Sequence, residues 1–248
     1  AASDVYKRQG IDKDVVTDIK GRIFIGNIPV GVYTVTEYPI DKYVAPKSQT
    51  VTISNGQTST VNFSNVLKKF RVTVVKSDIE KGHAQGDAKL SGAKYGIFKG
   101  EQLIDTYTTD DNASFTTKYY VCDTDWTIRE IESSEGYLVN DEIYKVGAEP
   151  KLYTVELNNI NLDVVEMPIK NRISLIKHSD DGSSKIETPE KDAEFEVFLK
   201  SSGGYNNADE DERDVIITDK YGFGFTKLLP YGTYTVHQIK GTEGTEFI

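Results

Sequence analysis

Three copies of one short strand pattern recur along the sequence, and this internal repeat constrains the fold more than any other feature. Residues 31–37, 125–130 and 232–238 read Gly-Val-Tyr-Thr-Val-Thr-Glu, Asp-Trp-Thr-Ile-Arg-Glu and Gly-Thr-Tyr-Thr-Val-His-Gln. Each copy follows a Thr-Asp pair, whose Asp precedes the last residue of the copy by 19, 20 and 19 residues respectively. Offsets this constant indicate one structural module present three times.

The segments between the turns predict β-strands. Residues 33–37 and 71–76 alternate in polarity, are rich in Val, Thr and Tyr, and belong to runs interrupted by Gly, Asn and Asp. No stretch sustains the period of 3.6 that an amphipathic helix needs. We therefore predict an all-β protein built of tandem Ig-like β-sandwich modules.

Two further strand patterns set the expected module boundaries. Opening strands end in Lys76 and Lys177, and closing strands end in Asn65 and Asn171. The expected domains are 11–69, the C-terminal part of a module; 70–171, a complete module; and 172–248, the N-terminal part of a module. Residues 1–10 match no module and are expected to be foreign or unstructured, and the chain is expected to be a piece of a longer protein.

Charge and cysteine content exclude several classes of function. A formal net charge of −10 argues against nucleic acid and anionic membranes as partners. No apolar run approaches the roughly 20 residues that span a bilayer. A single cysteine, Cys122, excludes a disulfide framework and a cysteine-based zinc cluster, and it is expected to be a structural thiol rather than the thiol of an internal thioester. Because no catalytic or metal-binding motif appears, we expect no turnover enzyme, no cofactor and no metal.

Charged and amide side chains fall on strand faces that are otherwise apolar. Residues two apart share a face, so Lys76 lies with Val72 and Val74, and Glu130 lies with Ile128. By the same rule Asn171 is expected on an inward face shared by Val165, Met167 and Ile169. An unpaired charge or amide buried there would cost several kcal/mol, so these side chains are expected to compensate one another.

These pieces together resemble a known family. They are the strand ending in Lys76-Ser77-Asp78, the segment 90–95, the Tyr-x-Val-x-Glu strand, Glu135-Gly136-Tyr137 and the terminal Asn. From about residue 11 onward the sequence is similar to the Cna protein B-type modules (SpaA-like, prealbumin-like) of Gram-positive surface proteins and pilins. The resemblance implies a prealbumin-like sandwich and an intramolecular isopeptide bond between the opening-strand Lys and the closing-strand Asn, promoted by the Glu.

Carried over residue by residue, the resemblance implies Lys76 as nucleophile, Asn171 as electrophile and Glu130 as the proton-handling acid. Burial favours the neutral amine and the protonated carboxyl that such a reaction needs. The alternative is a hydrogen-bonded cluster of the same three side chains without a crosslink.

The outer modules are expected to form no such bond within this chain. The first keeps Glu37 and Asn65 but has no opening-strand Lys, whereas the third keeps Lys177 but has Gln238 where Glu is expected. Gln cannot exchange protons as a carboxyl does.

The resemblance implies a structural stalk or spacer of an extracellular, cell-wall-associated adhesin or pilin-like protein, stiffened by the crosslink. Host matrix protein or glycan would then bind through other regions of the parent protein. The alternative is a module that itself binds matrix protein or glycan, through aromatic-rich loops around Tyr119-Tyr120 and Tyr205. A backbone pilin would need a sorting signal and a linkage lysine that the sequence does not show.

Overall fold

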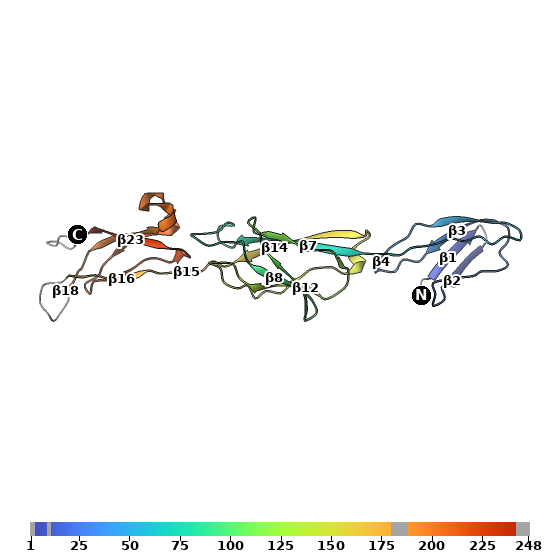
Figure 1. Ribbon diagram of the computed structural model, residues 1–248, viewed down its shortest axis with the longest axis horizontal. Helices are drawn as coiled ribbons and strands as arrows, with labels where there is room; N and C mark the ends of the chain where they lie inside the picture. The colour runs from blue at the N-terminus through green and yellow to red at the C-terminus, as the bar shows by residue number, and fades with distance from the viewer. Residues whose placement is uncertain (1–2, 9–10, 180–187, 242–248) are drawn as a thin grey trace. The chain divides into compact units, whose positions relative to one another are not determined.

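A computed structural model of the chain describes residues 3–8, 11–179 and 188–241 (Figure 1). The chain divides into two compact units. The first comprises Ala1–Thr73, Thr116–Thr127 and Lys145–Asn161, and the second comprises Val74–Phe115, Ile128–Tyr144 and Leu162–Ile248. The division into three modules stays a prediction.

The fold is all-β, as the alternating sequence predicts. Within the described ranges the regular elements are antiparallel and parallel strands joined by turns, and each 3-10 helix has three residues. Across those same ranges, no helix has the length and apolar character needed to cross a bilayer.

The N-terminal strands of the first unit form a four-stranded antiparallel sheet in the order β2-β1-β3-β5. The strands of this sheet are β1 (Ser3–Arg8), β2 (Ile11–Val16), β3 (Gly31–Glu37) and β5 (Gln49–Ile53). A short pair, β4 (Tyr43–Val44) with β6 (Val66–Leu67), also belongs to this unit. Ser3–Arg8, expected to be foreign or unstructured, form a strand that pairs with both β2 and β3, so they are not unstructured. That they are foreign stays a prediction.

Several strands contribute residues to both units. They are β7 (Lys69–Asp78), β10 (Ser114–Thr116), β12 (Trp126–Glu132), β13 (Tyr144–Lys145) and β14 (Leu157–Glu166). One sheet has the order β10-β7-β11, where β11 is Tyr120–Val121, and β14 also pairs with β7. Another has the order β13-β12-β8-β9, where β8 is Lys94–Lys99 and β9 is Gln102–Thr108. The 3-10 helix η1 (Pro150–Leu152) lies between β13 and β14 in the sequence.

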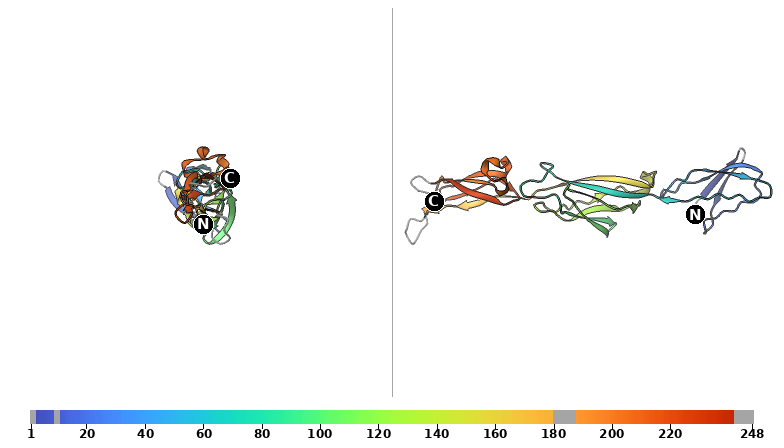
Figure 2. Two further views of the ribbon diagram at one scale, coloured as in Figure 1. Left: turned by 90° about the vertical axis from the view of Figure 1, so that its left-hand side faces the viewer. Right: turned by 45° about the horizontal axis from the view of Figure 1, so that its top comes forward.

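The strands β7 and β14 run in the same direction. Lys69 N donates to Glu156 O at one end, and Ile79 N donates to Glu166 O at the other. The residue numbers of both segments increase in the same direction, so the strands are parallel. Figures 1 and 2 show the two strands side by side. The opening and closing strands of the predicted middle module are therefore parallel neighbours.

The C-terminal part of the second unit contains short strand pairs and one three-stranded sheet. The pairs are β15 (Lys170–Asn171) with β22 (Leu229–Pro230), β16 (Ser174–Ile176) with β21 (Phe223–Phe225), and β17 (His178–Ser179) with β18 (Thr188–Pro189). The sheet β20-β19-β23 comprises Arg213–Ile217, Glu194–Leu199 and Tyr234–Lys240. Its core holds Ala193, Phe195, Val197, Ile216 and Leu229. The 3-10 helices are η2 (Lys200–Ser202), η3 (Tyr205–Asn207) and η4 (Glu210–Glu212).

The Thr-Asp turns of the sequence repeat have the same hydrogen bonds in all three places. The carboxylates of Asp18, Asp110 and Asp219 each accept the backbone N–H groups two and four residues later in the chain. Each Asp N–H also donates to the carbonyl of the fourth residue after it. Identical turns at the predicted offsets support the repeat and give a fixed reference point for comparing its copies.

Candidate functional site

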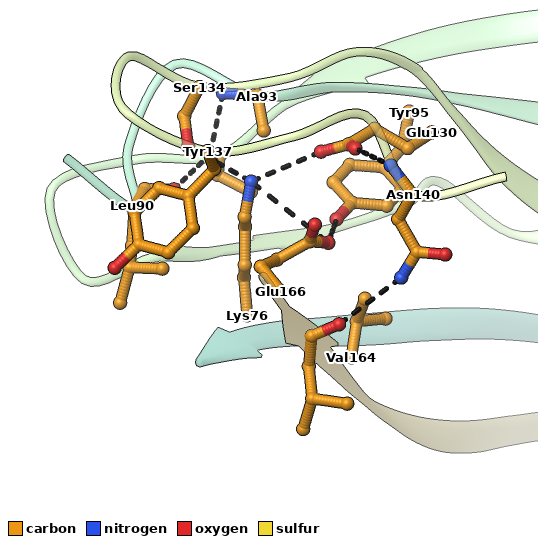
Figure 3. Close-up of polar contacts among 12 residues, drawn as sticks. Lys76, Leu90, Ala93, Tyr95, Glu130, Ser134, Tyr137, Asn140, Val164 and Glu166 are labelled. Atoms are coloured by element: carbon orange, nitrogen blue, oxygen red, sulfur yellow. Dashed lines mark hydrogen bonds and ion pairs between the residues drawn. The ribbon is translucent and has the colours of Figure 1, made fainter. Parts of the chain in front are cut away.

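The amine of Lys76 lies at the centre of a buried polar cluster (Figure 3). Its Nζ atom is 3.1 Å from Glu130 Oε1, 2.9 Å from Ser134 Oγ and 4.0 Å from Glu166 Oε1. It also lies 5.4 Å from the centroid of the Tyr137 ring, within the range of a cation–π contact. The cluster therefore holds one amine and two carboxyl groups.

Three different strands supply these groups, and each places its side chain inward. Lys76 comes from β7, Glu130 from β12 and Glu166 from β14. Val72 and Val74, which share the inward face with Lys76, are fully buried, as the alternation predicts. The side chains of the three charged residues are 0% exposed, so their interactions are not weakened by contact with solvent.

The two carboxyl groups have different surroundings. Glu130 Oε2 accepts the backbone N–H of Asn140 at 2.7 Å, while its Oε1 faces Lys76. Glu166 Oε1 accepts the Tyr95 hydroxyl at 2.7 Å, whereas its Oε2 is buried with no hydrogen-bond partner among the described residues. Glu130 is thus the better satisfied carboxylate.

Burial raises the pKa of Glu166, and the Tyr95 hydroxyl and the Lys76 charge offset this only in part. Burial and the adjacent Glu166 also raise the pKa of Tyr95, so its hydroxyl remains a donor. Within this cluster, burial therefore favours the protonated form of the Glu166 carboxyl.

A second buried carboxylate, Asp78, adjoins the cluster through Tyr137. The Tyr137 hydroxyl donates to Asp78 Oδ2 at 3.0 Å, and Gln85 Nε2 donates to both carboxylate oxygens at 2.9 and 3.0 Å. Burial acts to raise the pKa of Asp78, but the N–H groups of Lys81 and Glu80 and these side-chain donors lower it overall. Tyr137 therefore lies between the two sites. Its hydroxyl donates to the Asp78 carboxylate, and its ring faces the Lys76 amine.

The structure brings Lys76 and Glu130 together, but it does not bring Asn171 to them. Asn171 is exposed and lies in β15, where it pairs with Leu229. The inward face expected for this segment was wrong by one residue, because Val165 and Met167 are 48% and 56% exposed. The opposite face, with Val164 and Glu166, is the buried one. A one-residue shift in register moves every side chain of a strand to the other face.

Sequence reasoning missed Glu166, although the repeat contains the signal that identifies it. Asn65 lies eleven residues before Lys76, and Glu166 lies eleven residues before Lys177, whereas Asn171 lies six before it. Counting back from the opening lysines therefore aligns Glu166, not Asn171, with Asn65. In the middle copy a carboxyl group stands where the first copy has an amide.

The first copy has the complementary composition. Asn65 Nδ2 donates to Glu37 Oε1 at 2.8 Å, and Glu37 is buried. This predicted pair is together, without an opening-strand lysine.

In the third copy the two predicted residues have other partners. Lys177 Nζ is 3.8 Å from Glu190 Oε1, and Gln238 Nε2 donates to Lys240 O at 3.2 Å. Neither contact reproduces the cluster around Lys76. The described residues thus hold one complete lysine–carboxyl cluster of this type.

Comparisons with known proteins agree with this fold. Residues 75–161 match the family described as SpaA, a prealbumin-like fold domain. Among curated proteins, no match to the sequence was found. Among solved structures, the Bacillus anthracis TIE protein is similar over 96% of this chain and 42% of its own, at 20% identity and a TM-score of 0.71.

Two pilus proteins are similar at lower TM-scores. A Streptococcal ancillary pilin is 15% identical, with 100% of this chain and 86% of that chain covered and a TM-score of 0.36. The C-terminal fragment of the pilus adhesin SpaC from Lactobacillus rhamnosus GG is 14% identical, with 73% and 78% covered and a TM-score of 0.40.

Residues 75–161 therefore match the prealbumin-like fold domain of the SpaA type, the family that their motifs resemble. The likeness to the TIE protein concerns the fold, and the chain spans less than half of that protein's length.

Proposed function

We propose that the chain is a structural stalk or spacer segment of a cell-wall-associated surface protein, resembling an adhesin or a pilin. The observation that carries this proposal is the parallel pairing of β7 with β14. A match to a prealbumin-like fold domain over residues 75–161, three matching Asp turns and an acidic composition are consistent with this role. The parent protein would be extracellular, and contacts with matrix protein or glycan would be made by its other regions.

Parallel terminal strands give a module mechanical resistance. Tension on this module enters at the N-terminal end of β7 and leaves at the C-terminal end of β14. Because the two strands are parallel neighbours, tension pulls them in opposite directions along their length. Their hydrogen bonds are then loaded together rather than one at a time.

The buried cluster adds a second restraint near the C-terminal ends of the two strands. Lys76 and Glu166 stand near the C-terminal ends of β7 and β14, and the Lys76 amine also contacts Glu130 of β12. Breaking a buried ion pair by removing one partner costs about 3–5 kcal/mol, since it leaves an uncompensated charge. Sliding the strands apart would separate these charges in the same way.

The crosslink predicted between Lys76 and Asn171 stays a prediction, and the contacts around Lys76 favour a noncovalent cluster. Amide formation at Asn171 would release ammonia, but Asn171 is exposed and lies in β15, whose backbone pairs with β22. Amide formation at Glu166 would release water, and a carboxylate is a poor acceptor for an amine that is itself held as an ion pair. We therefore propose that the middle module resists force without an internal covalent bond.

Intact mass spectrometry of the denatured chain distinguishes these states. We expect the mass calculated from the sequence. A mass lower by one ammonia would instead indicate the bond to Asn171, and one lower by one water the bond to Glu166. Glu166→Asn, which restores the amide found at position 65, is the control. This variant places an amine, a carboxyl and an amide in one cluster. Its measured mass is expected to be lower by one ammonia than the mass calculated from its own sequence.

Single-molecule pulling tests the stalk itself. Without a crosslink, unfolding residues 70–171 should give an extended chain of about 340–370 Å, at roughly 3.3–3.6 Å per residue. A bond between residues 76 and 166 would hide about nine-tenths of this length. We expect the full release, at a higher force than that of the same module pulled through residues on neighbouring antiparallel strands β8 and β9. Easy unfolding at low force in the β7–β14 direction would contradict the stalk proposal.

A further inference from the structure

Residues 79–89 of the middle copy form a loop, the joint loop, that binds the third copy. Asp87 contacts the backbone just before β23 at two points: its N–H donates to Tyr231 O, and its Oδ2 atom accepts the Thr233 N–H, both at 2.9 Å. Its Oδ1 atom accepts the Ser201 hydroxyl, also at 2.9 Å. The loop and the residues that it binds belong to the second compact unit.

Charged side chains join the same loop to η4 of the third copy. Lys81 Nζ lies 2.5 Å from Asp211 Oδ2, and Gly86 N donates to Glu212 Oε1 at 2.8 Å. Hydrogen bonds to an ionised acceptor are stronger than those between neutral groups. The third copy is therefore held at two separate places, the backbone before β23 and η4.

Two glycines of the joint loop show where it is packed against the third copy. Gly86 has a φ of +60°, and a Cβ added to it would lie 2.3 Å from Tyr231 O. Gly82 has a φ of +77°, but a Cβ added there would have no atom within 4 Å. The loop is thus in tight contact with the third copy at residue 86 and open at residue 82.

Asp78 anchors the joint loop in the middle copy. Its Oδ1 atom accepts the backbone N–H groups of Glu80 at 2.7 Å and Lys81 at 3.0 Å, and it also accepts Gln85 Nε2 at 2.9 Å. The Tyr137 hydroxyl donates to Oδ2 at 3.0 Å. Asp78 is buried, so these bonds are shielded from solvent. One carboxylate therefore holds both the beginning of the loop and its later part.

The segment that carries Tyr137 also connects the buried cluster to the third copy. Lys76 Nζ donates to Ser134 Oγ at 2.9 Å (Figure 3). The next residue, Glu135, accepts the Tyr231 hydroxyl at 3.0 Å. Consecutive residues of one segment thus contact the cluster around Lys76 and the third copy.

We propose that the joint loop clamps the third copy onto the middle copy, so that the two copies move as one rigid body. Domains that are joined by a linker alone move relative to one another unless an interface fixes them. The contacts of Lys81, Gly86 and Asp87 provide such an interface, and Asp78 and Tyr137 hold the loop in shape from inside the middle copy. The mechanical consequence rests on the proposed function: a stalk with this clamp passes tension between the two copies without a hinge.

Distances between two spin labels, measured by double electron–electron resonance, test the clamp on the whole chain. Cys122→Ala removes the native thiol, and Glu101→Cys in the middle copy and Lys220→Cys in the third copy carry the labels. Both labelled positions are exposed. We expect one narrow distance distribution, because a clamped third copy has a single position relative to the middle copy.

Variants of the joint loop separate the clamp from the backbone of the loop itself. Gly86→Ala should widen the distribution roughly twofold or more, since its Cβ cannot fit beside Tyr231 O. Gly82→Ala, in the same loop and with a similar φ, is the matched control and should leave the width unchanged. Asp87→Ala adds no atoms to the joint and should widen the distribution as well. Unchanged hydrogen exchange in β8 and β9 would show that the middle copy stays folded in all three variants.

Tyr137→Phe tests the anchor inside the middle copy. The substitution removes a donor to Asp78 without adding atoms, so the joint loop should loosen and the distribution should widen. Tyr144→Phe is the control, because the Tyr144 hydroxyl accepts the Asn140 amide outside the loop, and it should have no effect. An unchanged width in Tyr137→Phe would contradict the anchoring role of Asp78 and Tyr137.

A broad distribution in the chain that carries only the labels would overturn the clamp, and so would an unchanged width in both Gly86→Ala and Asp87→Ala. Equal widening by Gly82→Ala and Gly86→Ala would also overturn it, since the backbone of the loop, rather than its contact with the third copy, would then set the distance. None of these results depends on the pulling of residues 70–171, so failure of the clamp is distinguishable from failure of the stalk proposal.

Discussion

The exchange of Asn for Glu at one position changes the chemistry of the repeated cluster. Asn65 can donate a hydrogen bond to Glu37, but ionised Glu166 can only accept. In the middle copy the Lys76 amine contacts both carboxyl groups and donates where the first copy has the Asn65 amide. The first copy, with one carboxyl and one amide, holds together without a lysine.

The raised pKa of Glu166 predicts a specific pH dependence. Its pKa in the folded chain lies above the value of 4.5 that applies when the chain is unfolded. Between these two values the folded state binds more protons, so the free energy of unfolding falls as the pH rises through this window. Glu166→Gln removes this titration, and its stability relative to the wild type should increase with pH from about 4.5 upward before levelling off.

Urea unfolding at a series of pH values measures this difference. Glu101→Gln, at an exposed carboxyl, is the matched control and should run parallel to the wild type. If the Glu166→Gln and wild-type stabilities also ran parallel across the window, Glu166 would not be the group that holds the proton.

At the scale of elements, how well the sequence predicted a strand depended on whether both of its faces were apolar. The alternation of β7 is clear, because the polar residues Arg71 and Thr73 flank Val72 and only Val75 interrupts the pattern. Its inward face was therefore predicted correctly. In residues 164–169 apolar residues occupy both faces, so alternation alone could not fix the register of β14.

The site was predictable to the same extent as its strands. Lys76 and Glu130 follow from inward positions on strands with a clear pattern. Glu166 required the spacing between copies rather than the pattern within one. Ser134 and Tyr137 come from the segment after β12, where no periodicity indicates which side chains turn inward.

The tight turn at Gly136 gives a prediction about an individual element. Gly136 has a φ of +85°, and a Cβ added to it would lie 2.4 Å from the Ala88 Cβ. Gly92 has a similar φ of +89° but open space around it. Gly92→Ala should therefore cost only the left-handed backbone penalty, about 1–2 kcal/mol. Gly136→Ala adds overpacking and should cost about 2–5 kcal/mol in the free energy of unfolding.

Thermal and urea unfolding of the two variants in parallel separate backbone strain from crowding. Equal destabilisation by the two substitutions would mean that the contact between Gly136 and Ala88 is not tight. The destabilisation at Gly136 would then come from its left-handed backbone alone, and not from crowding between residues 136 and 88.

At the scale of the whole molecule, the second compact unit depends on bonds between segments far apart in the sequence. Asp87 accepts the backbone N–H of Thr233 and the hydroxyl of Ser201, both at 2.9 Å. Asp87 N donates to Tyr231 O at 2.9 Å, and the Tyr231 hydroxyl donates to Glu135 at 3.0 Å. A stalk that transmits force needs such bonds, because a loosely tethered segment would rotate or extend before the force reached the folded modules.

Asp87→Ala tests whether these bonds hold the unit together. The substitution removes a charged acceptor from the Thr233 amide, and hydrogen bonds to charged groups contribute about 1.5–3 kcal/mol. Hydrogen exchange at the Thr233 amide should therefore accelerate roughly tenfold or more, while amides in β8 and β9 keep their rates. Asp111→Ala, at an exposed carboxylate of the same unit, should leave Thr233 unchanged. Unaltered exchange at Thr233 in Asp87→Ala would show that other contacts keep residues 229–233 in place, and the stiffness proposed for the stalk would then have to come from the strand pairing alone.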